Sequence, residues 1–271
     1  MLQTTIQSGF ARNRSEALHP RLFPDAGWWC PSLQSPGGTR LHDLRGSNWG
    51  TLTMMDAASD WVVSGGRGAL DFDGSNDRAE ITGTYSGLIS SKIFSLSFWM
   101  RTTAANTNTY PFTLGNSAND NPICGFRMST TGAGTIAFFY RDNAGNFVIP
   151  GDATVVNDGQ WNHVVATCNG STAQLFVNGR ASGSASSISS LGASTINRVT
   201  IGALGRISVL AFYSGLLDDA RIYRDPLSAG DVRQLWQLGR GNMPMIRKRR
   251  YTEEAAATTN RRRRLICGSN C

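Results

Sequence analysis

The sequence lacks long apolar runs and several common catalytic motifs. No stretch of its 271 residues approaches the roughly 18 consecutive apolar residues of a membrane span. The N-terminal segment has no apolar core of the kind found in secretory signal peptides, so export by that route is not expected. The sequence contains no G-K-S, G-K-T, G-x-S-x-G or H-E-x-x-H motif. Their absence argues against P-loop enzymes, α/β-hydrolases and zinc proteases.

Residues for metal-ligand and carboxylate chemistry are also scarce. The five cysteines include no C-x-x-C pair and the three histidines lie far apart, so a zinc site is not expected. Cys124 and Cys168 lie in apolar runs and are predicted to be buried free thiols. Cys267 and Cys271 are the only close pair, and the sequence leaves their redox state open. Of the four glutamates, only Glu80 lies between the two terminal segments.

The positive charge is concentrated near the C-terminus. Between Gly239 and Cys271 there are nine Arg or Lys and two Glu, a net charge of +7, while the rest of the chain is neutral. These basic residues could bind an acidic neighbouring subunit, neutralise nucleic-acid phosphates, or simply be solvated. We favour the first, with anchoring residues Arg247, Lys248, Arg249, Arg250, Arg261, Arg262, Arg263 and Arg264.

The dominant pattern in the middle of the chain has a period of two. Residues 94–102, FSLSFWMRT, alternate large apolar with mostly polar side chains, and many similar short runs follow. Turn sequences such as Asp73-Gly74 and Asn178-Gly179 separate these runs. The pattern predicts an all-β, antiparallel sandwich or barrel. One helix is expected, capped by Ser228 with Asp231 and stopped by Gly239.

Four segments together resemble the laminin-G-like, concanavalin-A-like jelly-roll domain found in phage and bacterial proteins. They are ALDFDGSNDRAEI, FSLSFWMRT, WNHVVATCNGSTAQLFVNGRA and LLDDARIYRDPLSAGDVRQLW, and the resemblance covers roughly residues 26–238. It implies a two-sheet jelly roll that binds carbohydrate or protein, often with a structural calcium. Hydrolases of this fold share an E-x-D-x-x-E type strand, which is missing here, so an enzyme is not expected. The predicted organisation is an arm over 1–24, the sandwich over 25–239 and a basic extension over 240–271.

Calcium is the metal that the resemblance favours. The turn from Asp73 to Asp77 offers carboxylate, hydroxyl and amide oxygens, the ligands that calcium takes in sets of six to eight. Asp219 could approach from the closing strand, which makes Asp73, Asp77 and Asp219 the candidate ligands. The alternative is an Asx-type turn satisfied by its own backbone.

A carbohydrate site needs aromatic rings beside amide or carboxylate groups. The loop 103–121 is long, polar and aromatic, and its candidate ligand-binding residues are Tyr110, Asn119 and Asp120. His163, in a strand with Val164, is expected to pack or hydrogen-bond rather than to catalyse.

From these observations we predict a non-enzymatic structural and binding protein of a virus particle, of the phage type, in a decoration, capsid-associated or fibre role. The sandwich would contact host-surface glycans, while the extensions would anchor it to neighbouring subunits such as the capsid protein, within a homo-oligomer or larger assembly. The predicted location is the virion, assembled in the host cytoplasm, with no membrane partner. The alternatives are a calcium-dependent bacterial carbohydrate-binding module and a glycoside hydrolase using Asp71 and Asp73.

Overall fold

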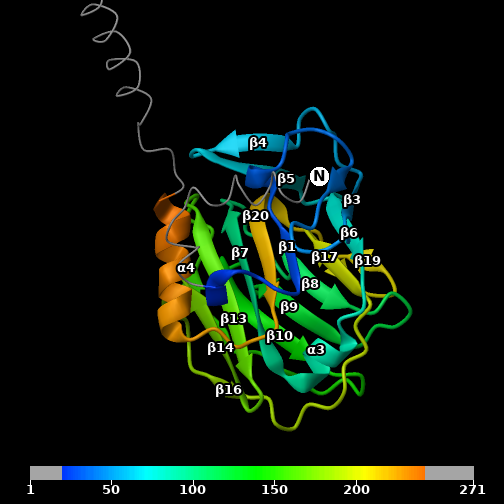
Figure 1. Ribbon diagram of the computed structural model, residues 1–271, viewed down its shortest axis with the longest axis vertical. Coiled ribbons are helices and arrows are strands. Elements are labelled where there is room, and N and C mark those ends of the chain that lie inside the picture. The colour runs from blue at the N-terminus through cyan, green and yellow to red at the C-terminus, as the bar shows by residue number, and fades with distance from the viewer. Residues whose placement is uncertain (1–19, 242–271) are drawn as a thin grey trace, which may run out of the picture.

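Two antiparallel β-sheets stacked face to face form most of the computed structural model, which describes residues 20–241 (Figure 1). In spatial order, the first sheet contains β15 (Arg180–Ala181), β14 (Thr172–Val177), β13 (Asn162–Asn169), β7 (Ile93–Arg101), β20 (Ser214–Tyr223), β5 (Arg67–Asp73) and β4 (Trp61–Ser64), with β1 (Gly27–Trp29) beside β20 and β16 (Ser186–Ser187) beside β14. This arrangement confirms the predicted jelly-roll sandwich.

The second sheet faces the first across the core. It contains, in order, β11 (Phe147–Val148), β10 (Thr135–Arg141), β9 (Ile123–Met128), β8 (Phe112–Gly115), β17 (Arg198–Ile201), β6 (Arg78–Thr82), β3 (Gly50–Thr53) and β2 (Arg40–Leu41), with β12 (Gly151–Val155) beside β10. A separate hairpin joins β18 (Leu204–Gly205) to β19 (Val209–Leu210). The remaining elements are the helices α3 (Ser86–Ser91) and α4 (Ala229–Gly241) and the 3-10 turns η1 (Pro20–Leu22) and η2 (Pro31–Leu33).

The core lies between the sheets and is rich in aromatic rings. Phe98 of β7 contacts Phe112 and Phe126 of the second sheet, with ring centroids 6.0 and 4.8 Å apart. Cys124 and Cys168 are buried free thiols in this core, as predicted. Each fully buried aromatic side chain contributes roughly 1.5–3 kcal/mol of hydrophobic stabilisation. The predicted alternation of β7 is therefore explained by one face that points into the sandwich.

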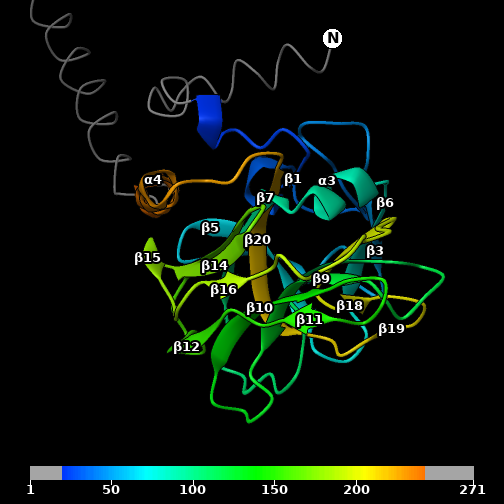
Figure 2. The ribbon, with the colours of Figure 1, turned by 90° about the horizontal axis from the view of Figure 1, so that it is seen from below.

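The opposite face of the first sheet is buried as well. Val165 and Phe176 project outward from β13 and β14 and pack against Leu22, Val232 and other apolar residues of η1 and α4. Figure 2 shows α4 on the side of β14 that faces away from β10 and β12. The middle of this sheet is thus covered on both faces, which explains why the polar-looking face of β7 is also inaccessible.

Helix α4 begins as predicted and ends later than predicted. Ser228 Oγ accepts the N–H of Asp231, and the Asp231 carboxylate accepts the N–H of Ser228, a reciprocal cap. Gly239 does not stop the helix, which continues to Gly241. A Cβ on Gly239 would lie 2.3 Å from the Trp99 ring, so glycine serves close packing at this position.

Residues 1–19 and 242–271 lie outside the described residues, and with them the eight basic residues predicted to anchor the protein. The predicted domain boundaries therefore stay predictions. Within the described range, no helix is long and apolar enough to cross a membrane.

Candidate functional site

The predicted calcium turn is satisfied largely by its own backbone. Asp73 Oδ1 accepts the N–H groups of Ser75 and Asn76 at 2.7 and 3.3 Å, and Asp77 Oδ2 accepts the N–H of Asp73 at 3.0 Å. Although partial burial opposes ionisation, these backbone N–H bonds lower the pKa of Asp73 below its usual value. The geometry is that of the Asx-type turn named above as the alternative.

The third predicted calcium ligand lies elsewhere. Ser214 pairs with Asp73, and Asp219 lies five residues further along β20, where its carboxylate binds Arg221 Nε at 2.7 Å. Although burial opposes ionisation, the Arg221 guanidinium lowers the pKa of Asp219. Between residues 20 and 241, no three His, Cys, Asp or Glu side chains gather as metal ligands. The predicted trio therefore does not form one site, and calcium binding at the turn alone stays a prediction.

A bulge in β20 explains the position of Asp219. The register with β7 shifts between Asp218, which pairs with Trp99, and Arg221, which pairs with Ser97. Asp219 adopts a left-handed backbone conformation, with φ of 58°. Adjacent strand residues normally point to opposite faces of a sheet. The bulge instead directs both carboxylates to partners on the outer face of the first sheet.

Asp218 belongs to a buried network that joins three parts of the chain. Its carboxylate binds Arg67 Nη1 at 2.7 Å and accepts the N–H of Ser32 at 3.1 Å. Arg67 also donates to the carbonyl of Gly239 at 2.8 Å and stacks 4.2 Å from the centre of the Trp99 ring. All of these charges are buried and paired, so the network holds η2 and α4 on the sheet rather than offering a ligand site.

His163 has the structural role that was predicted for it. The imidazole is buried and stacks on Trp99, with ring centroids 4.9 Å apart. Burial lowers its pKa to about 3, so the ring is neutral at neutral pH.

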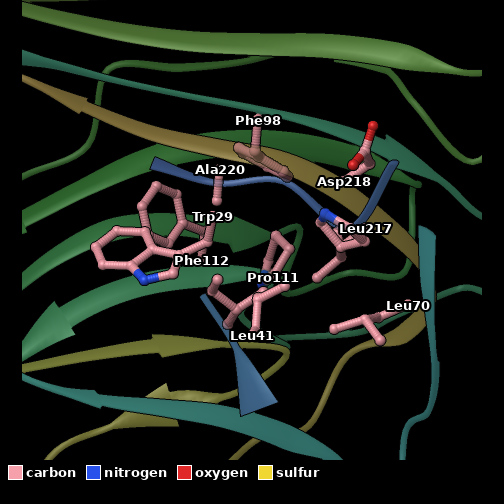
Figure 3. Close-up of a pocket in the computed structure, with 11 residues that line it drawn as sticks. Trp29, Leu41, Leu70, Phe98, Pro111, Phe112, Leu217, Asp218 and Ala220 are labelled. Atoms are coloured by element: carbon pink, nitrogen blue, oxygen red, sulfur yellow. The ribbon is translucent and has the colours of Figure 1, made fainter. Parts of the chain in front are cut away.

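The cavity drawn in Figure 3 lies inside the sandwich and is too small for a sugar. This cavity measures about 10 Å³, which is space for one water molecule at most. Figure 3 shows apolar side chains around it and the Asp218 carboxylate at its margin, away from Leu41 and Leu70. A ligand the size of a sugar therefore does not fit in this cavity.

Tyr110, the predicted aromatic residue of the loop 103–121, is part of a small outer core. It is only 6% exposed and packs with three other buried residues on the outer face of the second sheet: Ile123, Phe139 and Leu204. Burial raises the pKa of Tyr110, and the neighbouring guanidinium of Arg127 opposes that shift. Tyr110 thus supports the surface without presenting its ring to solvent.

Asn119 and Asp120 are exposed beside this outer core. The carbonyl of Asn119 accepts the N–H of Ile207 at 3.1 Å. The Asp120 carboxylate lies 3.3 Å from Arg206 Nη1, and its carbonyl accepts a hydrogen bond from Arg141 Nη2 at 3.1 Å. The structure therefore brings all three predicted ligand-binding residues to one surface region.

Sequence reasoning missed the residues that give this region its charge. Arg127 of β9, Arg141 at the end of β10 and Arg206 between β18 and β19 surround Tyr110 and Phe139, and we call them the arginine cluster. The alternation in GFRM and FFYR places Arg127 and Arg141 on the face opposite the core rings, which is the signal that was available. Nothing in the sequence connects Arg206 to them.

Solved structures with a similar fold include toxin binding domains. The botulinum neurotoxin serotype D binding domain superposes with a TM-score of 0.60 at 13% identity, covering 81% of this chain and 53% of that one. For the binding domain of Paraclostridial Mosquitocidal Protein 1 the TM-score is 0.56 at 14% identity, covering 80% and 52%. Trypanosoma rangeli sialidase, in complex with the inhibitor DANA, gives 0.52 at 14% identity, covering 78% and 32%. At these identities the similarity establishes the fold alone, and the chain spans about half the length of the two toxin domains.

The family assignment comes from the sequence of the sandwich itself. No curated protein matches the chain. A family model described as the concanavalin A-like lectin/glucanases superfamily matches residues 73–233, more than half of the chain and most of the strands described above. The protein therefore belongs to the concanavalin A-like lectin/glucanase superfamily and has a lectin-like jelly-roll fold.

Proposed function

We propose that this protein is non-enzymatic and binds a carbohydrate on the outer face of its second sheet, beside the loop 103–121. The observation that carries the proposal is an exposed aromatic platform next to charged hydrogen-bond donors. Phe147 is 60% exposed and stacks on buried Phe139, with ring centroids 5.8 Å apart and an interplanar angle of 24°. Arg141, which pairs with Phe147 across β10 and β11, supplies the donors.

This combination suits a sugar because a sugar ring has an apolar C–H face and a polar rim of hydroxyls. An aromatic face covers the first, and a small number of fixed polar groups orient the second. A single exposed phenylalanine would mean little by itself, since scattered apolar residues are normal on protein surfaces. The support comes from its position on a rigid ring pair at the edge of the arginine cluster.

Carbohydrate binding is tested with a glycan array probed by the full chain, with and without calcium. We expect binding that Phe147→Ala abolishes. Val63→Ala is the matched control, because Val63 is 75% exposed on β4 of the other sheet. If both variants bind as the wild type does, the ligand surface is not here. Polysaccharide hydrolysis that depends on Asp71 or Asp73 would instead support the hydrolase alternative.

We further propose that the protein is carried by a virus particle, of the phage type, in a decoration, capsid-associated or fibre role. The support is the division of charge, with a net +7 after residue 238 and a neutral remainder, which suits a basic extension that attaches a neutral sandwich to neighbouring subunits. A calcium-dependent bacterial carbohydrate-binding module is the alternative. Mass spectrometry of density-purified particles should recover peptides of residues 25–239 at stoichiometric abundance. Recovery only from the soluble fraction would reject the particle role.

A further inference from the structure

The arginine cluster has more positive charge than its surroundings neutralise. The guanidinium groups of Arg127 and Arg141 lie 5.3 and 5.6 Å from the centre of the Phe139 ring. Within residues 20–241, neither guanidinium forms an ion pair, and Asp120 is the single carboxylate paired with the cluster, through Arg206. Three positive charges thus share one negative charge.

The donors of the cluster are also incompletely used. The Nε atoms of Arg127, Arg141 and Arg206 are buried and have no hydrogen-bond partner in the described part of the chain. Arg67 Nε in the buried network of the first sheet is likewise unpartnered, so the excess of positive charge, more than the unpaired donors, distinguishes this cluster. Burial lowers the pKa of Arg141, and the positive charge of the nearby Arg206 lowers it further.

Asp120 is loosely held in comparison with the buried aspartates. Its side chain is 63% exposed, and one contact of 3.3 Å joins it to Arg206. By contrast, Asp219 binds Arg221 through two contacts of 2.7 and 2.8 Å. An exposed, single-contact ion pair is weak, so a ligand carboxylate can displace it.

We propose that the arginine cluster binds a glycan bearing carboxylate groups, and that Asp120 occupies the position of the ligand's carboxylate until the ligand arrives. This inference rests on the proposed carbohydrate binding and specifies the chemical class of the ligand. The planar guanidinium fork matches a carboxylate, and the one anion that the cluster already holds is a carboxylate. The sugar ring would lie against Phe147 while its carboxylate takes the place of the Asp120 carboxylate on Arg206, near Arg141.

The proposal reverses the role first predicted for Asp120. A lectin that binds neutral sugar hydroxyls through an aspartate loses its affinity when the aspartate is replaced. Here Asp120 competes with the ligand, so Asp120→Asn should strengthen binding. Because the displaced pair is worth about 1 kcal/mol or less, we expect a gain of up to about fivefold.

The test uses the full chain and carboxylate-bearing glycans of several kinds: oligogalacturonate, alginate oligosaccharides and sialyllactose. Each is paired with a probe of the same backbone whose carboxylates are esterified or missing, and dextran sulfate represents sulfated polymers. We expect at least one acid form to bind, its neutral partner to bind at least tenfold more weakly, and dextran sulfate to bind more weakly than the acid form. Arg141→Gln and Arg206→Gln should each weaken binding about tenfold, whereas Arg180→Gln, on exposed β15 of the other sheet, should not.

The outcomes separate this inference from the proposed function. If neutral glycans bind as well as acid forms and Phe147→Ala abolishes that binding, carbohydrate binding stands and the carboxylate inference is overturned. Stronger binding of dextran sulfate, or loss of binding in Asp120→Asn, also overturns it. If neither the wild-type protein nor any variant binds a glycan, both proposals fail. Thermal unfolding of each variant shows whether the substituted protein is folded.

Discussion

The outer faces of the two sheets use the same residue types in opposite ways. On the first sheet, Arg67 and Arg221 are each paired with a buried aspartate and stacked on a tryptophan. On the second sheet, Arg127 and Arg141 are stacked on Phe139 and, among the side chains that the structure describes, have no carboxylate of their own. α4 and η1 cover part of the first face, and the second is left partly open. Arginine and aromatic residues therefore stabilise the fold on the first face, whereas on the second we propose that they bind a ligand.

The largest expected effect tests the buried side of this comparison. Arg67→Met removes a buried guanidinium and leaves the Asp218 carboxylate unpaired. We expect the free energy of unfolding to fall by about 3–5 kcal/mol in urea titrations. Arg206→Met, on the second sheet, should change it by less than about 1 kcal/mol, because its ion pair is exposed. Equal losses in the two variants would show that the faces do not differ in this way.

The packing of α4 on the first sheet should be nearly as sensitive. Gly239→Ala introduces a methyl group 2.3 Å from the Trp99 ring, and relieving that overlap should cost about 1–3 kcal/mol. Gly230→Ala is the control at the other end of the helix, where the nearest atom is Ser228 Oγ at 3.5 Å. There the greater helix propensity of alanine should leave stability unchanged or slightly raised. A thermal denaturation series comparing the two variants checks this.

Acid should loosen the first face through His163. The pKa of His163 is about 3 in the folded protein, whereas its ordinary value is 6.5. Between these two pH values the unfolded chain takes up a proton that the folded protein does not. The stabilisation is complete above pH 6.5 and is lost as the pH falls toward about 3, by up to about 1.4 kcal/mol per pH unit.

His163→Phe keeps a ring against Trp99 but cannot be protonated. Denaturant titrations at pH 7 and pH 5 should therefore show a smaller difference for this variant than for the wild type. A wild-type protein whose stability is constant across this interval would contradict the assignment.

The smallest expected effect concerns calcium. Since the oxygens of the Asp73 turn already accept backbone N–H groups, EDTA should leave the melting temperature unchanged to within about a degree. A rise on adding calcium, lost in Asp77→Asn, would show that the turn binds the ion after all.

Several features of the fold could be predicted because they depend on neighbours in the sequence. The alternation of β7, the turn at Asp73-Gly74 and the reciprocal cap of Ser228 with Asp231 all follow from local backbone preferences. Gly239 shows where local rules failed. Glycine commonly ends a helix, but here it sits within one because the ring of Trp99, far away in the sequence, packs against it.

The candidate site was predicted in part for the same reason. Polarity and aromatic content singled out the loop 103–121, and Tyr110 and Asp120 do lie beside the arginine cluster. The sequence could not show that Tyr110 is buried, or that Arg206 reaches Asp120 from the hairpin beyond β17.

The sequence by itself determined the sandwich, its superfamily and the concentration of charge near the C-terminus, since alternation, motifs and composition are properties of short segments. Only the tertiary structure decided which arginines are paired. Arg67 meets Asp218 across β5 and β20, whereas Arg127, Arg141 and Arg206 converge from β9, β10 and the β18–β19 connection. Whether a charge is neutralised depends on partners brought together by folding, and these lie far apart in the chain.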